Sequence, residues 1–192
     1  MKLRKSLTAL AVLGFALAGP ALAQHPERPF IIEARGGLYV PTFDVADLAD
    51  PGPGLGVSFG YFITPDLLVF GEADFGFHSG AEISEGFDGP DIDVFHFMAK
   101  AGYVVYASRD GKLRLLVNAG AGALSFEPDV EAAESNTYLA VNAGAKLYYQ
   151  FHRAVGLVVS PQGDIAFVDE DDGFTGSTAW VWPFSAGFYL SF

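Results

Sequence analysis

Histidine, serine and acidic side chains lie close together at one point of the sequence, where they could form a nucleophilic catalytic set. His78 and Ser79 are adjacent, and Glu82 and Glu85 follow. A serine nucleophile needs a histidine within hydrogen-bond distance and an acid that orients the imidazole. Adjacent residues at a strand end point to opposite faces, so His78 and Ser79 are not expected to engage each other. The sequence therefore predicts no catalytic residues, no cofactor and a protein that is not an enzyme.

Clustered carboxylates are the second candidate chemistry, because carboxylate oxygens are suitable ligands for Ca²⁺ or Mg²⁺. The densest cluster comprises Asp169, Glu170, Asp171 and Asp172, but it lacks the EF-hand spacing and the distal glutamate. Acidic side chains without any basic residue also fill three further segments, about 42–54, 79–91 and 127–137. These segments indicate solvated loops, and divalent cations are candidate partners there.

A third group of polar residues occurs at every second position of alternating segments. Its charged members are balanced, with four acids against four lysines and arginines, as an enclosed space requires. We expect this group to form one internal network in the lumen of a barrel. Its members are Glu33, Arg35, Glu72, Asp74, His96, Lys100, Arg114, Asn118, Asn142, Lys146, Gln162 and Asp164.

The elements that must position these residues are strands, because the recurring apolar period is two throughout and no helical period is present. Each segment approaches or exceeds the roughly 9–11 residues with which a tilted strand crosses a bilayer. The eight expected strands cover about 29–41, 55–63, 67–78, 92–106, 113–126, 138–151, 155–167 and 179–192.

The connections between these strands alternate in length. Three short ones follow the second, fourth and sixth strands, and the long ones are the acidic segments together with 168–178. Short periplasmic turns and longer external loops are typical of outer-membrane barrels. A soluble barrel would instead place its apolar face inside. Aromatic residues near the strand ends and the balanced polar face favour the membrane alternative, an all-β, eight-stranded antiparallel up-and-down transmembrane β-barrel.

The first residues have the pattern of a secretory signal. Lys2, Arg4 and Lys5 precede an apolar run, and Ala21-Leu22-Ala23 gives the small residues of a cleavage site. We expect a signal peptide at 1–23, an N-terminal periplasmic segment at 24–28 and the barrel at 29–192.

Composition excludes several other classes of protein. The chain has 192 residues, 51% of them hydrophobic, and a net charge of -12. Its acidic balance argues against nucleic acid as a partner, since such binding needs a basic face. It has no cysteine, which excludes disulfide scaffolds and thiolate metal sites.

With this pattern the chain resembles the small eight-stranded outer-membrane β-barrels, of the OmpA transmembrane-domain and OmpX type, across 29–192. The most specific element is Phe184-Ser185-Ala186-Gly187-Phe188-Tyr189-Leu190-Ser191-Phe192. The resemblance implies that Phe188, Leu190 and Phe192 form an assembly signal read by the outer-membrane insertion machinery. It also implies a location in the bacterial outer membrane, with its lipid and lipopolysaccharide as partners. The surface partner is unknown, because the loops contain no recognisable motif.

An eight-stranded barrel is just wide enough for side chains to fill its interior. We therefore expect a plugged and mostly polar lumen, with Glu72 opposite Lys100 and paired with it. Pro161 and Pro183 predict a bulge or bend in their strands. The function that follows is a non-enzymatic barrel supporting envelope integrity or surface interaction. The alternatives are a narrow channel or hydrophobic-ligand conduit, and a lipid A-modifying acyl hydrolase or acyltransferase.

Overall fold

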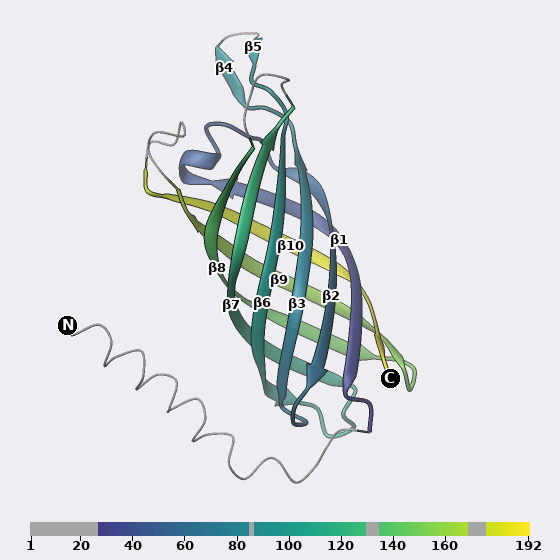
Figure 1. Cartoon of the computed structure of the whole chain (residues 1–192). Coiled ribbons are helices and arrows are strands. Elements are labelled where there is room, and N and C mark those ends of the chain that lie inside the picture. Colours follow the sequence, from purple (N-terminus) through teal and green to yellow (C-terminus); the bar gives the residue numbers. More distant parts are fainter. Residues whose placement is uncertain (1–26, 85–86, 130–134, 169–175) are drawn as a thin grey trace, which may run out of the picture.

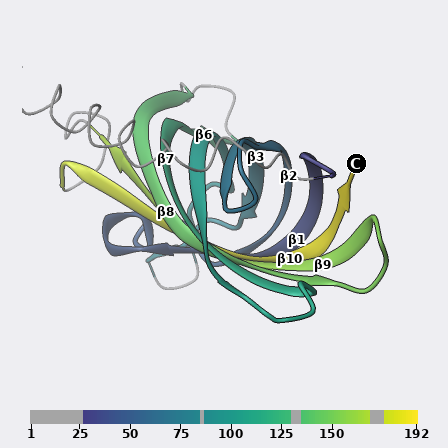
Figure 2. The same cartoon turned by 90° about the horizontal axis from the view of Figure 1, so that it is seen from below.

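Eight antiparallel strands close into one barrel in the computed structural model, which describes residues 27–84, 87–129, 135–168 and 176–192. Neighbours in the wall follow the order β1-β2-β3-β6-β7-β8-β9-β10, and β10 pairs with β1 (Figures 1 and 2). The barrel strands are β1 (Phe30–Thr42), β2 (Gly52–Phe62), β3 (Leu67–His78), β6 (Ile92–Ala107), β7 (Leu113–Pro128), β8 (Asn136–Gln150), β9 (Val155–Phe167) and β10 (Thr178–Ser191). The predicted fold class is confirmed. The expected signal peptide at 1–23 lies outside the described residues.

The two-residue period separates the side chains into a buried inner set and an exposed outer set. In β2, buried and exposed residues alternate along nearly the whole strand. The outer set is apolar: Leu139 is 67% exposed and Phe188 62% exposed. Because water would strongly disfavour so continuous an apolar surface, lipid must surround the wall. Within the described part of the chain, no helix is long and apolar enough to cross a membrane.

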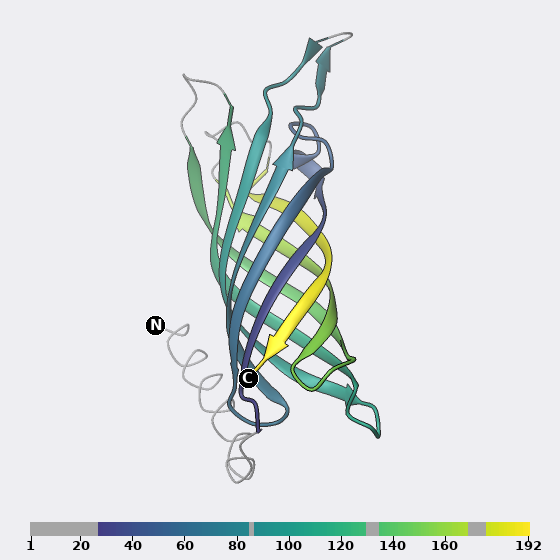
Figure 3. The ribbon, with the colours of Figure 1, turned by 90° about the vertical axis from the view of Figure 1, so that its right-hand side faces the viewer.

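Three tight turns lie at one end of the barrel, which we call the short-turn end; Phe192 lies at the same end (Figure 3). They join β2 to β3, β6 to β7, and β8 to β9. In the turn before β7, Gly111 adopts a φ of 70°, a left-handed conformation that glycine tolerates without strain. Hydrogen bonds from the Ser108 hydroxyl and the Lys112 amide hold the pKa of Asp110 below its usual range.

The longer connections lie at the opposite end, which we call the long-loop end. The connection after β1 contains a short 3-10 helix, η2 (Phe43–Val45). The connection after β3 carries the two-stranded hairpin β4 (Glu82–Ser84) and β5 (Phe87–Asp88), which projects beyond the wall (Figure 3). The predicted alternation of short and long connections is therefore confirmed.

Strand register differs from the sequence-based expectation at two places. Lys100 is paired with Phe70 and Glu72 with Met98, so the prediction that Glu72 lies opposite Lys100 is wrong by one two-residue step. A bulge or bend was expected at Pro161 and at Pro183, and the pairing of β9 and β10 shows no bulge at either. Pairing is interrupted near both prolines, because proline cannot donate to a ladder, but the register continues unchanged on either side. The wall shifts register between Val104 and Tyr106 of β6 instead.

The seam between β1 and β10 closes the wall. Phe30 and Phe192 exchange two backbone hydrogen bonds of 3.1 Å each. Their rings stack with centroids 5.6 Å apart, and Tyr61 packs on Phe30 at 5.1 Å. These rings form part of an aromatic girdle at the short-turn end.

Candidate functional site: the lumen of the barrel

A network of buried polar side chains crosses the middle of the lumen. Each charged member is at most 4% exposed, and five of the eight barrel strands contribute to it. Inward-facing positions two residues apart supply its pairs of neighbours, such as Glu33 with Arg35 and Glu72 with Asp74. The members that make the contacts described below are Glu33, Arg35, Glu72, Asp74, His96, Lys100, Asn142, Lys146, Tyr148, Ser160, Gln162 and Asp164.

Glu72 is the centre of this network. Its Oε2 lies 2.7 Å from Arg35 Nη2 and 2.8 Å from Lys146 Nζ. Its Oε1 accepts a hydrogen bond from Lys100. The predicted pair of Glu72 and Lys100 is thus in contact, although the contact is diagonal rather than directly across the ladder. Three cations around one carboxylate compensate the cost of removing it from water.

A second carboxylate, Glu33, extends the network toward the short-turn end. It accepts hydrogen bonds of 2.6 Å from both Lys146 Nζ and the Tyr148 hydroxyl. The Lys146 ammonium also lies 4.4 Å from the centre of the Phe70 ring, at a distance suited to a cation–π contact. The fully buried Lys146 therefore has favourable partners on several sides.

His96 connects the network to a third group of acids. Its Nδ1 lies 2.7 Å from Asp164 Oδ2, and its Nε2 lies 3.2 Å from Asp74 Oδ2 and 3.4 Å from Glu72 Oε1. Asn142 donates a 2.6 Å hydrogen bond to the other oxygen of Asp164. Both ring nitrogens of His96 therefore face carboxylate oxygens.

The structure brings ten of the twelve residues predicted for the lumen into this network and leaves two outside it. Asn118 is buried, but its side chain makes no hydrogen bond to the described residues. Arg114 lies near the short-turn end over the ring of Phe62, at 5.3 Å. The predicted charge balance counted Arg114 as the fourth cation of the network, and this is wrong. Parity along a strand predicts that a side chain points inward but not where it lies along the barrel axis.

Sequence reasoning missed two members of the network. Tyr148 and Ser160 each bond a charged partner, Glu33 and Arg35 respectively. Tyr148 lies between Lys146 and Gln150 in the two-residue period, and that parity is the signal that could have identified it.

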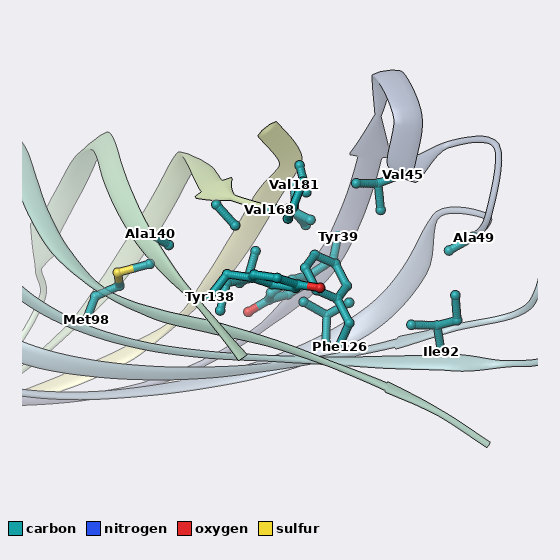
Figure 4. Packing of buried hydrophobic residues seen from close by; sticks show 14 residues of the cluster. Tyr39, Val45, Ala49, Ile92, Met98, Phe126, Tyr138, Ala140, Val168 and Val181 are labelled. Carbon is teal, nitrogen blue, oxygen red and sulfur yellow. The ribbon is translucent and has the colours of Figure 1, made fainter. Parts of the chain in front are cut away.

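The lumen is polar only in its middle, which corrects the expectation of a mostly polar interior. Toward the long-loop end lies an upper apolar cluster (Figure 4). Tyr39, Phe126 and Tyr138 lie close together there, and Val45 and Ala49 enter from the connection after β1. Both of these loop residues are 1% exposed. The full cluster comprises Tyr39, Val45, Ala49, Ile92, Val94, Met98, Leu124, Phe126, Tyr138, Ala140, Ala166, Val168, Ala179 and Val181.

Hydrogen bonds attach this loop to the connection after β3. The Asp50 amide donates to the Ser79 carbonyl at 2.9 Å, and the Ala81 amide donates to the Leu48 carbonyl at 3.1 Å. His78 Nδ1 donates a 2.8 Å bond to the Asp50 carbonyl. The connection after β1 therefore covers the upper cluster, and we call its residues 43–51 the lid.

A lower apolar cluster lies between the ion network and the short-turn end. Every barrel strand contributes at least one side chain to it. Its members are Ile31, Phe62, Leu68, Phe70, Val104, Leu116, Tyr148, Val158 and Tyr189. The interior thus has three layers: apolar, ionic and apolar.

Glu72, Asp74 and His96 form a group whose ligand atoms lie within 4.8 Å of one another, close enough for a metal ion. Arg35 and Lys100 already occupy the carboxylates of this group. A divalent ion would have to displace those cations, so the group fits an ion-pair network better than a metal centre. The acidic cluster Asp169–Asp172, the metal candidate of the sequence, lies outside the described residues.

The candidate catalytic pair is not assembled. His78 is buried and bonded to the lid, whereas Ser79 is exposed. The two side chains lie on opposite faces, as expected for adjacent residues of a strand end.

Comparison with known proteins agrees with this geometry. The family model described as "Outer membrane protein beta-barrel domain" matches residues 7–189. No functionally curated protein matches the chain.

Solved structures of bacterial outer-membrane proteins share the fold. Neisserial surface protein A is similar with a TM-score of 0.66 and 14% identity, over 85% of this chain and 97% of that one. OprG of Pseudomonas aeruginosa has a TM-score of 0.61 and 14% identity, over 88% and 97%. The N-terminal barrel of OprF from the same organism has a TM-score of 0.53 and 20% identity, over 84% and 97%. Likeness at these identities shows the fold alone.

Proposed function

Since this chain belongs to the outer membrane protein β-barrel family and lies in the bacterial outer membrane, we propose that it is a closed, non-enzymatic barrel that supports the integrity of the cell envelope. Its acidic loops face outward and are available for contacts at the cell surface. The partners of the wall are outer-membrane lipid and lipopolysaccharide, and the insertion machinery is its partner during assembly.

The three-layered filling of the lumen carries this proposal. The lower cluster draws on every strand of the wall, and the upper cluster includes the lid. Between them, ion pairs such as Lys146 with Glu33 join opposite parts of the wall. Ions entering such an interior would have to displace packed side chains and break buried pairs, which is costly.

The geometry supports a role without catalysis. His78 holds the lid, and His96 is enclosed by carboxylates. No hydroxyl group of serine approaches either imidazole in the manner of a nucleophile and its base, as far as the described residues show. An unchanged lipid A mass spectrum after overexpression is the expected result, and a change in acyl chains would contradict this part of the proposal.

A conductance recording tests whether the lumen is closed. Purified protein inserted in a planar bilayer at neutral pH should give no stable large conductance, whereas an open porin in the same bilayer serves as the positive control. A stable conductance from the purified protein would show that ions pass through the lumen and would contradict a closed barrel.

A deletion strain tests the envelope role. Loss of the protein should increase uptake of a hydrophobic dye and sensitivity to detergent, and the wild-type gene should restore both. A variant with Asp169, Glu170, Asp171 and Asp172 changed to the matching amides should restore them equally, because the barrel body carries this role. An unchanged barrier after deletion would contradict envelope support, and failure of the amide variant alone would assign the role to the loop.

A further inference from the structure

The short-turn end of the barrel contains an open hollow of about 590 Å³. Phe62 and Val104 of the lower apolar cluster line its inner part. Three arginines also line it, Arg28, Arg114 and Arg153, together with two acids. In a chain of net charge -12, this is an unusual concentration of basic groups around a concave surface.

Arg114 differs from the other inward-facing cations of the barrel. Arg35, Lys100 and Lys146 each lie within 4 Å of at least one carboxylate. Arg114 has no such ion pair with any residue in the described part of the chain, and its guanidinium lies over the Phe62 ring at 5.3 Å. A half-buried cation without a counter-charge is unfavourable, so the position favours an anion from outside the chain.

Other donors surround this cation. The buried hydroxyl of Tyr189 lies close to the Arg114 guanidinium, but the two do not meet in good hydrogen-bond geometry. At the rim, Arg28 and Gln150 both donate to the Arg153 carbonyl, the latter at 2.9 Å. These bonds hold the turn that carries Arg153 against the segment that carries Arg28.

We propose that this hollow is a binding site for an oxyanion of the phosphate type, with Arg114 as its central ligand and Arg28 and Arg153 at its rim. A guanidinium presents a planar fork of donors that matches two phosphate oxygens, and the ring below it fixes its plane. The short-turn end faces the periplasm in outer-membrane barrels. The anion is therefore either a soluble phosphate ester of the periplasm or the headgroup of an inner-leaflet phospholipid.

The test follows the arginine side-chain NMR signals of the folded protein in a maltoside detergent, which itself carries no phosphate. Inorganic phosphate is titrated at constant ionic strength, with chloride as the competing anion. In a second arm, nanodiscs containing phosphatidylglycerol are compared with nanodiscs made from an uncharged lipid. Arg114→Gln and Arg153→Gln are the test variants. Arg109→Gln is the matched control, because Arg109 lies at the same end but does not line the hollow.

Saturable phosphate binding that weakens about tenfold or more in Arg114→Gln, and changes little in Arg109→Gln, supports the site with a soluble anion as ligand. A shift of the Arg114 signal only with phosphatidylglycerol supports it with a lipid headgroup. Arg114→Lys keeps the charge but not the fork, and it should bind more weakly than wild type. The proposal is overturned if neither arm shifts Arg114, or if Arg109→Gln loses as much affinity as Arg114→Gln.

Discussion

His96 completes the charge balance of the ion network. Four carboxylates, those of Glu33, Glu72, Asp74 and Asp164, face three permanent cations, because Arg114 lies elsewhere. A neutral imidazole offers one donor and one acceptor, yet both nitrogens of His96 face carboxylate oxygens. With all four carboxylates ionised, the imidazolium form offers a proton on each nitrogen and brings the sum of charges to zero.

We therefore predict that both ring nitrogens of His96 carry protons in the folded protein at neutral pH. Nitrogen-15 NMR of the imidazole measures this directly. The variant Asp164→Asn is the control, because it removes one negative charge beside Nδ1, so that a neutral imidazole balances the network. A neutral tautomer in the wild-type protein would contradict the prediction.

Lys146 is the residue whose loss should cost the most stability. Lys146→Met leaves Glu33 and Glu72 with fewer cations in a fully buried setting. Removing one partner of a buried ion pair lowers the free energy of unfolding by about 3–5 kcal/mol. Denaturant unfolding in detergent, followed by tryptophan fluorescence, measures the change.

The matched control for this variant is Lys112→Met. The Lys112 side chain is 59% exposed and lies 3.9 Å from Asp110 in a solvated turn. Its loss should change the free energy of unfolding by no more than about 0.5 kcal/mol. Equal effects of the two substitutions would mean that the network does not stabilise the barrel.

Parity along the strands is sufficient to predict which residues face the lumen, but not which ones meet. Asp74 and Arg35 are far apart in sequence, and their 3.0 Å contact depends on how strands shift along one another around the wall. Parity predicts correctly that Arg114 points inward, but it does not predict its depth, and Arg114 lies over Phe62 outside the ion network. Tyr148 shows the opposite case, an inward residue overlooked because its type is also common on lipid-facing surfaces.

At the scale of elements, the lid closes the long-loop end of the lumen. Val45 is 1% exposed within the upper cluster, whereas Leu48 of the same segment is 37% exposed. Phe43 begins the lid with a φ of 56°, which is strained for a bulky residue, and its ring packs edge-on against Trp180 at 5.6 Å. Packing beneath the lid therefore has to offset backbone strain at its start.

We predict that Val45→Asp detaches the lid without unfolding the wall. A buried aspartate with no cation in the upper cluster is unfavourable, and the segment can escape it by lifting into water. Hydrogen exchange should then accelerate at the amides of Asp50 and Ala81, which bond across the lid.

Leu48→Asp is the control for the lid, since its side chain already meets solvent. Exchange at the same amides should stay close to that of wild type. If Val45→Asp also leaves exchange unchanged, the lid is held by its hydrogen bonds and not by the packing of Val45.

The strands themselves were predictable because a wall between lipid and a packed lumen imposes a strict two-residue period. Their bounds differ from the expected ones by only a few residues, largest at the start of β2. The register was not predictable to the same degree. The expected register took position 86 as the centre of the connection after β3, whereas β3 and β6 pair about position 85, and one residue in the centre moves every pair by two. Pro161 and Pro183 were also compatible with a constant register between β9 and β10.

At the scale of the whole molecule, assembly in the cell can be distinguished from stability by substituting two phenylalanines, one within β10 and one directly after it. Phe184 and Phe192 are both 50% exposed on the lipid face. We predict that Phe192→Ala reduces the amount of heat-modifiable, folded barrel in the outer membrane severalfold, whereas Phe184→Ala has little effect. The reason is that the assembly signal implied by the resemblance includes Phe192 and not Phe184.

Refolding of both variants from urea into lipid vesicles separates recognition from packing. Without insertion machinery, the two should fold to similar extents. If Phe192→Ala folds poorly there as well, its contact with Phe30 accounts for the defect and a recognition signal is not needed.

Phe30 and Phe192, at the two ends of the barrel sequence, are hydrogen-bonded to each other in the closed wall. The closed wall could therefore be built by a chain that starts at a different strand. Consider a circularly permuted chain with a short linker between these residues and new ends in the turn at 108–112. All pairs of neighbouring strands would be retained, and only the covalent connection between β6 and β7 would be lost. In such a chain β6 would be made last and β7 first. Permutation therefore changes the order of synthesis while it leaves the same side chains inside and outside, so the direction in which a cell builds this cylinder becomes an experimental variable.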